Sequence, residues 1–207
     1  MHIFTPRLRR VTLFTTTYFV IFSAASIATQ NYEFMLYEVQ MALLFALLIF
    51  MDKRVTFSAL VLWLMSIWGL AHLAGGITPI PSTIADMNDA ISPDAPQVLY
   101  NMRLTDFLPR YDQIIHAYGF GTCTLLAREA LSAHLGKKLP INWPIGAALV
   151  LIAMGLGTIN EIIEFAVQLS LPQTNVGGYI NTGWDLVSNT VGAIGAVLWM
   201  RWRDQSR

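Results

Sequence analysis

Residues that bind metals or transfer protons recur at helical spacing in the second half of the chain. They form three pairs whose members lie three or four residues apart, which places both side chains on one face of an α-helix. The pairs are Asp112 with His116, Glu161 with Glu164, and Asp185 with Asn189. A further histidine, His72, precedes them in WGLAHLAGG. Carboxylates and imidazoles are ligands of divalent metals and also act as general acids and bases.

Gathered in one place, these acids would repel one another if all were ionised, and a bound cation would neutralise them. An oxygen-rich set with a few imidazoles suits Zn, Mn, Mg or Fe, and such a set can bridge two ions. The expected metal ligands are Asp112, His116, Glu164 and Asp185, with Glu161 or His72 as general base or as partner of a ligand. Neither HExxH nor ExxH occurs, so this metal site is inferred from helix facing and membrane depth.

The composition requires these side chains to be positioned by membrane helices. Of 207 residues, 55% are hydrophobic and 13% are charged, against roughly 25% charged in average soluble domains. We therefore predict an all-α polytopic membrane protein, a bundle of about six transmembrane helices forming a single domain over residues 1–207. The predicted spans are 11–29, 35–50, 55–76, 111–134, 143–171 and 184–202, and an outer loop at 77–110 is long enough to act as a lid.

The distribution of basic residues predicts the orientation, since cytoplasmic loops carry the excess of Lys and Arg. With these spans, one side holds eleven of the thirteen basic residues and the other holds only Arg103 and Arg110. Both termini are therefore predicted to be cytoplasmic. The first stretch also has features of a signal peptide, but a retained first helix gives the better charge balance.

This topology predicts one depth for the polar residues of four helices. His72, Asp112 and His116 all lie within about ten ångströms of the outer boundary, at 1.5 Å per residue. Glu164 and Asp185 share that layer, and Glu161 and Asn189 lie somewhat deeper. We therefore expect a single outward-facing site. A structural interpretation stands beside it, in which polar side chains hold helices together and Asp112 and Asp185 cap helix N-termini.

Charge and cysteine usage exclude other function classes. Thirteen basic residues balance thirteen acidic ones, so no excess positive charge attracts nucleic acid. The single cysteine, Cys123, cannot form an internal disulfide. Arg110, with Arg103, is placed to meet an anionic headgroup or phosphate at the outer surface.

Four segments together resemble a known family. AHLAGG, YDQIIHAYGFG, NEIIEF and GGYINTGWDLVSNTVGA resemble the YjdF-like bacterial inner-membrane proteins, whose function is unknown, and are distantly similar to the VanZ-like proteins. The resemblance covers roughly residues 65–200 and implies a multi-pass protein of the bacterial inner membrane. The matching positions are His72, Asp112, His116, Glu161, Glu164 and Asp185.

Two positions depart from that pattern. Gln113 stands where the YjdF-like pattern commonly has an arginine, and Asn189 stands where it often has a second acid, although VanZ-like proteins also have asparagine there. The missing acid weakens the argument for two metals.

These observations favour a metal-dependent hydrolase or transferase that acts on a lipid-linked substrate, with Asn189 and Arg110 supporting the site. An alternative is a transporter or ion-coupled permease in which the same acids carry protons or cations. Few ionisable groups in the inner halves of the spans, and the absence of an inverted repeat, argue against transport. A non-catalytic protein that binds lipid or a partner is the third hypothesis.

Overall fold

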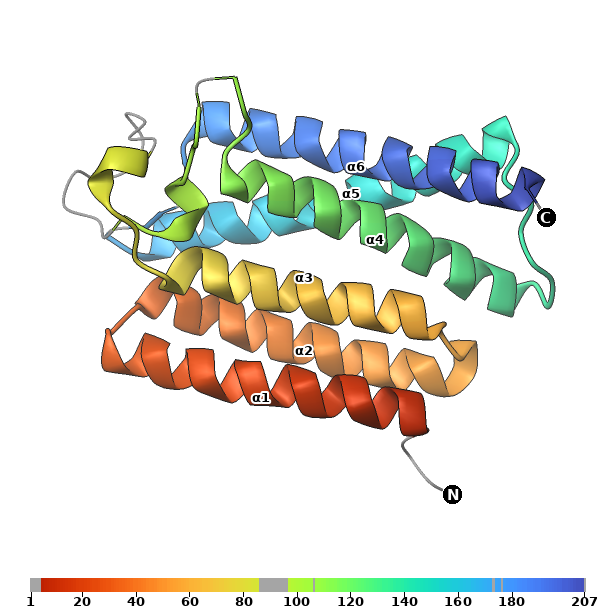
Figure 1. Ribbon diagram of the computed structural model, residues 1–207, viewed down its shortest axis with the longest axis horizontal. Helices are drawn as coiled ribbons and strands as arrows, with labels where there is room; N and C mark the ends of the chain where they lie inside the picture. The colour runs from red at the N-terminus through yellow and green to blue at the C-terminus, as the bar shows by residue number, and fades with distance from the viewer. Residues whose placement is uncertain (1–4, 86–96, 106, 173, 176, 207) are drawn as a thin grey trace.

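The computed structural model describes residues 5–85, 97–105, 107–172, 174, 175 and 177–206, most of which lie in long α-helices (Figure 1). The helices are α1 (Pro6–Ala28), α2 (Tyr32–Val55), α3 (Ala59–Ile77), α4 (Tyr111–His134), α5 (Trp143–Ser170) and α6 (Tyr179–Gln205). The prediction of an all-helical, polytopic membrane protein with six helices is confirmed. The second apolar stretch, expected over 35–50, belongs to a helix of 24 residues.

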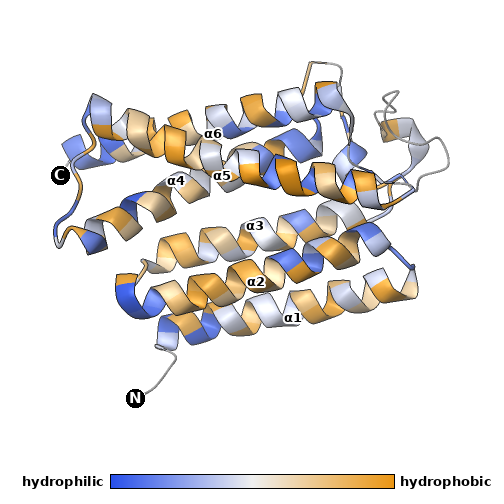
Figure 2. Cartoon of the chain, turned by 180° about the vertical axis from the view of Figure 1, so that it is seen from behind, coloured by the Kyte–Doolittle hydropathy of each residue, from blue (hydrophilic) through white to orange (hydrophobic). Residues whose placement is uncertain are grey.

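Four of these helices are long and apolar enough to cross a membrane, namely α1, α2, α3 and α5. In Figure 2, apolar residues run along α1, α2 and α3, with hydrophilic residues near the helix ends. The other two helices, α4 and α6, make the most extensive contact with each other. Helix α4 lies between α3 and α6, and α6 packs against α4 and α5 (Figure 1). The polar side chains of α4 and α6 therefore find protein partners at these contacts.

Polar residues fix where the helices begin. The side chains of four N-cap residues each accept a hydrogen bond from a backbone N–H in the first turn, which satisfies one of its free donors. These residues are Thr5, Asn31, Ser58 and Asn142. The connections between α1 and α2 and between α2 and α3 are short, so these three helices are antiparallel neighbours (Figure 1).

The first helix is integrated into the bundle by buried polar contacts. Thr15 Oγ1 lies 2.6 Å from Ser66 Oγ, and the Tyr18 hydroxyl donates to the Ser66 carbonyl at 2.9 Å. Near the other end of α1, Ser26 donates to Glu38 Oε1 at 2.6 Å. These contacts join α1 to both α2 and α3.

A glycine allows α4 and α6 to approach closely. An added Cβ on Gly192 would overlap the carbonyl oxygen of Ala117, and one on Gly121 would lie 3.0 Å from the Gly192 carbonyl oxygen. The backbones of the two helices are therefore in direct contact, which is the use of small residues in membrane bundles.

The start of α1 and the end of α6 lie at the same end of the bundle, together with the α2–α3 and α4–α5 connections (Figure 1). We call this the inner end and the opposite one the outer end, following the charge-based orientation. Arg207 lies outside the described residues.

At the outer end, the segment between α3 and α4 folds back on itself. Ile80 N donates to the Gln97 carbonyl at 3.0 Å, and Arg103 N donates to the Ile84 carbonyl at 3.1 Å. Two short 3₁₀ turns, η1 (Ser82–Ile84) and η2 (Leu99–Asn101), belong to this segment. Residues 86–96 and 106 of the predicted lid lie outside the described residues.

Candidate metal centre

Four side chains from three helices meet inside the bundle. His116 comes from α4, Glu161 and Glu164 from α5, and Asp185 from α6. Each offers one potential ligand atom, and these atoms all lie within 4.8 Å of one another. The predicted convergence of these helices on one polar centre is therefore observed, while the roles assigned to the individual residues stay predictions. We call these four residues the acidic centre.

His116 lies at the middle of the contacts. Its Nδ1 is 3.0 Å from Asn189 Oδ1 and 3.6 Å from Glu161 Oε1. Its Nε2 is 3.5 Å from Asp112 Oδ1 and 3.9 Å from Glu164 Oε1. An amide oxygen thus holds the ring at Nδ1, and carboxylates lie near both ring nitrogens.

Several carboxylate oxygens of the acidic centre are buried without a hydrogen-bond donor. Both oxygens of Glu161 and Oδ1 of Asp185 have no partner among the described residues. Asp185 is fully buried, and Glu161 is 7% exposed. Because buried polar atoms in native proteins are nearly always satisfied, these oxygens call for a proton or a cation.

Asp185 does not cap its helix. The expected span began at residue 184, but α6 begins at Tyr179, so Asp185 is the seventh residue of the helix. Its carboxylate consequently points from the interior of α6 into the bundle rather than toward free backbone donors.

Asp112 does not serve as a side-chain cap either. Gln113 Oε1 accepts the hydrogen bond from Arg110 N at 2.9 Å, which leaves the Asp112 carboxylate free to face His116. Asp112 is not among the four atoms that meet within 4.8 Å, and its side chain is 18% exposed, the highest value among the acids that face His116. It therefore lies at the rim of the acidic centre. Arg110, predicted as a supporting residue, is buried at the start of α4.

Sequence reasoning missed the asparagine that joins two of these acids. Asn181 Nδ2 donates to Asp185 Oδ2 at 2.6 Å and lies 3.2 Å from Asp112 Oδ2. It precedes Asp185 by four residues, so the same helical spacing indicates it. Sequence reasoning also missed Asn160, which precedes Glu164 by four residues and donates to Glu164 Oε1 at 2.6 Å.

His72 lies beside the acidic centre, among aromatic rings. Its Nδ1 makes a short hydrogen bond with the Tyr100 hydroxyl, and its ring packs against Phe34, Tyr37 and Tyr100. Burial raises the pKa of Tyr100 well above its usual value, and the nearby Asp112 charge raises it further. The hydroxyl therefore stays protonated and able to donate. The predicted catalytic role of His72 stays a prediction.

Another buried acid, Glu33, was not predicted. Its Oε2 accepts from Asn175 N at 2.8 Å, which joins the start of α2 to the α5–α6 connection. One turn further along α2, the Tyr37 hydroxyl is buried without a hydrogen-bond partner in the described part of the chain. The spacing of Glu33 and Tyr37 in YEFMLYE places both on one face of α2,.

The chain belongs to the DUF2238 family of predicted membrane proteins, whose family model matches residues 10–206. Neither the comparison with curated proteins nor that with solved structures gave a match.

Proposed function

We propose that this DUF2238 protein is a metal-dependent membrane enzyme, a hydrolase or a transferase that acts on a lipid-linked substrate from the outer side. One observation carries the proposal. Four potential ligand atoms lie within 4.8 Å of one another inside the bundle, and carboxylate oxygens of two of these residues, Glu161 and Asp185, have no hydrogen-bond donor among the described residues. Such a buried, electron-rich arrangement is the environment in which a divalent cation is stable.

The donor set fits a divalent metal. His116, Glu161, Glu164 and Asp185 would hold it, and one imidazole with several carboxylates suits Mn, Fe, Zn or Mg. When bound, the metal would polarise a substrate oxygen or activate a water molecule as a nucleophile. The carboxylates of the acidic centre would neutralise its charge in the apolar interior.

The surrounding residues orient this set. Asn189 Oδ1 accepts from His116 Nδ1 and so fixes the imidazole, as partners of metal-binding histidines commonly do,. Asn181 holds the carboxylates of Asp112 and Asp185 together. Asp112, at the rim, is the acid best placed to accept a proton from a substrate or water molecule.

A groove on neighbouring faces of α4 and α6, at the depth of the acidic centre, supports a lipid-linked substrate. A cavity of about 490 Å³ lies between α4, α6 and the segment before α4. Its lining combines polar and cationic groups with apolar ones, namely Arg103, Gln113, Trp184, Leu108, Val187 and Val191. Gln113 and Trp184 directly adjoin Asp112 and Asp185 in sequence, so this amphipathic groove lies at the depth of the acidic centre.

The resemblance to YjdF-like and, more distantly, VanZ-like proteins supports the bacterial inner membrane as the location. With that location and the charge-based orientation, the groove would open toward the outer leaflet.

The metal content of the purified protein tests the proposal. We expect near-stoichiometric divalent metal in the wild type and its loss in Asp185→Asn and Glu161→Gln. Glu38→Gln is the matched control, since Glu38 and Glu161 are each 7% exposed and Glu38 contacts Ser26 in another part of the bundle. In a Mn²⁺-loaded sample, nitrogen coupling from an imidazole should disappear in His116→Gln. A folded wild type that neither carries nor rebinds metal would overturn the proposal, as would full metal content in Asp185→Asn.

A further inference from the structure

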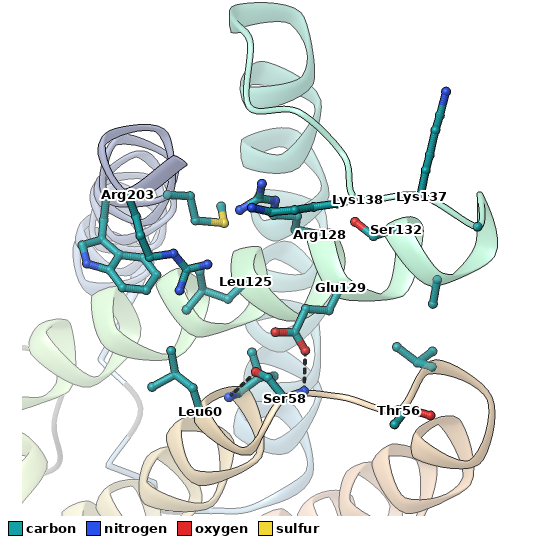
Figure 3. A pocket seen from close by; sticks show the side chains of 16 residues that line it. Thr56, Ser58, Leu60, Leu125, Arg128, Glu129, Ser132, Lys137, Lys138 and Arg203 are labelled. Carbon is teal, nitrogen blue, oxygen red and sulfur yellow. Dashed lines mark hydrogen bonds between the residues drawn. The ribbon is translucent and has the colours of Figure 1, made fainter. Parts of the chain in front are cut away.

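A second cavity lies at the inner end of the bundle, far along the helices from the acidic centre. Its volume is about 530 Å³, and it is bounded by the α2–α3 connection, the last turns of α4, the segment after α4 and the last turns of α6 (Figure 3). We call it the inner pocket. Nothing in the proposed metal chemistry uses it.

The inner pocket carries excess positive charge. Four cationic residues line it, namely Arg128, Lys137, Lys138 and Arg203. Two carboxylates oppose them, since Glu129 lines the pocket and Asp204 pairs with Arg128 and Lys138. Two positive charges therefore remain in excess.

Two of the cations are fixed by protein partners. Arg128 is 4% exposed and donates to the Leu139 carbonyl at 2.8 Å as well as to Asp204. Lys138 donates to Asp204 at 2.9 Å. Figure 3 shows Arg128 and Lys138 side by side, with Lys137 pointing away from them.

Arg203 has no such partner. Its guanidinium lies 4.4 Å above the centroid of the Trp199 ring, and its Nε is buried without a hydrogen-bond acceptor. No carboxylate in the described part of the chain forms an ion pair with it. Stacking on Trp199 holds the planar donors in place, which leaves them available to an anion.

The walls of the pocket are suited to a lipid rather than to a soluble anion. Leu60 and Trp199 line it and are 45% and 38% exposed, so the cationic groups adjoin apolar surface that faces the bilayer. The pocket also lies where α3 begins and α6 ends, at the level of the membrane interface. Basic pockets between membrane helices at this level bind anionic headgroups.

We propose that the inner pocket binds the phosphate headgroup of an anionic phospholipid, with Arg203 as its principal contact. The bound lipid would join α3, α4 and α6 at their inner ends. This proposal is independent of the metal centre.

Lipid retention tests the proposal. The full chain is reconstituted in nanodiscs containing phosphatidylglycerol and phosphatidylcholine, and native mass spectrometry measures which lipid remains bound. We expect retention of phosphatidylglycerol, weakened about fivefold by Arg203→Gln, the effect of about one cationic contact. Arg203→Lys keeps the charge and should restore part of the binding. Arg10→Gln is the control, because Arg10 is exposed at the inner end of α1. This substitution removes the same charge as Arg203→Gln, but outside the pocket.

Three outcomes would overturn the proposal. The first is equal retention of phosphatidylglycerol and phosphatidylcholine by the wild type. The second is an equal loss of binding in Arg10→Gln and Arg203→Gln, which would reflect general surface charge. The third is displacement of the lipid by inorganic phosphate at equal concentration, which would assign the pocket to a soluble phosphate. Thermal melting of each variant verifies folding, and the wild-type lipid preference tests the proposal even where a variant unfolds.

Discussion

The acidic centre predicts that replacing Glu161 by glutamine has opposite effects on stability with and without metal. Both Glu161 carboxylate oxygens are buried with no donor in the part of the chain that the structure describes, and Oε1 lies 3.6 Å from His116 Nδ1. Without a cation, the carboxylate is an unsatisfied buried group beside the carboxylate of Asp185. Glutamine keeps the shape, removes the charge and can donate to a neighbouring oxygen. The metal-free variant should therefore be more stable than the metal-free wild type.

The magnitudes follow from the two kinds of interaction. Relieving one unsatisfied buried group contributes about 1–3 kcal/mol to the free energy of unfolding. A chain of this size shifts its Tm by about 2–4 °C per kcal/mol, so Glu161→Gln should melt about 2–12 °C above the wild type in EDTA. Metal at about one thousand times its Kd stabilises the protein by about 4.1 kcal/mol. The wild type should therefore gain roughly 8–16 °C in metal, while the variant gains little.

Thermal unfolding in detergent, followed by tryptophan fluorescence, measures both effects. Wild type, Glu161→Gln and Glu38→Gln are each melted in EDTA and in excess Mn²⁺. The order of the first two Tm values should reverse between the two buffers, and Glu38→Gln should respond to metal as the wild type does. If Glu161→Gln is the less stable protein in both buffers and metal leaves the wild-type Tm unchanged, Glu161 is a structural hydrogen-bonding residue and the reasoning is refuted.

Two further predictions concern the bundle itself. Gly192→Ala should lower the free energy of unfolding by about 1–3 kcal/mol, because the added Cβ would overlap the Ala117 carbonyl,. Gly195→Ala is the control in thermal melts, because a Cβ at Gly195 meets nothing within 4 Å. Equal effects of the two substitutions would contradict the close contact between α4 and α6. Burial raises the pKa of Asp204, but hydrogen bonds and charges from Arg128 and Lys138 outweigh it and hold the pKa below its usual value. The stabilisation by Asp204 should therefore be complete above the unfolded pKa of about 4 and disappear as the pH falls through the lower folded value, so melts of wild type and Asp204→Asn should differ at neutral pH and converge in acid.

The sequence predicts the fold class and the meeting of α4, α5 and α6, because both follow from strong physical constraints. Hydrophobic runs predict helices, since hydrocarbon offers no partner to a free backbone group. Charged side chains inside such helices must face one another, because lipid cannot solvate them. These two rules place His116, Glu164 and Asp185 together without knowledge of any helix crossing angle.

The sequence does not predict the arrangement within the centre. Whether Asp112 or Glu161 joins the central atoms depends on helix rotation by a fraction of a turn, which hydropathy does not determine. Hydropathy also does not predict that α6 begins at Tyr179 rather than at 184, because the polar residues Asn181 and Thr182 lower the hydropathy of the first turns. Side chains that bridge acids, such as Asn181, become recognisable only when both partners are placed.

The position of His72 shows a further limit. Its depth was predicted from topology, but its neighbours come from η2 and α2, and an irregular segment has no periodicity from which to place Tyr100. An added Cβ on Gly75 would collide with the Tyr100 ring, so a glycine in α3 lets this ring approach the histidine. The glycine pair in AHLAGG therefore has a packing function that becomes visible only with the tertiary structure.

Small residues also set the geometry of the acidic centre itself. An added Cβ on Gly157 in α5 would lie 2.6 Å from Asn189 Nδ2, so the absence of a side chain there leaves room for the asparagine. Asn189 in turn lies 3.0 Å from His116 Nδ1, and Gly192, one turn further along α6, lies against the α4 backbone. The distance between α4 and α6 is thus fixed by backbone contact, and the asparagine spans it. The imidazole is oriented by the same close packing that holds the bundle together, so the structure that stabilises these helices also prepares the site for a cation.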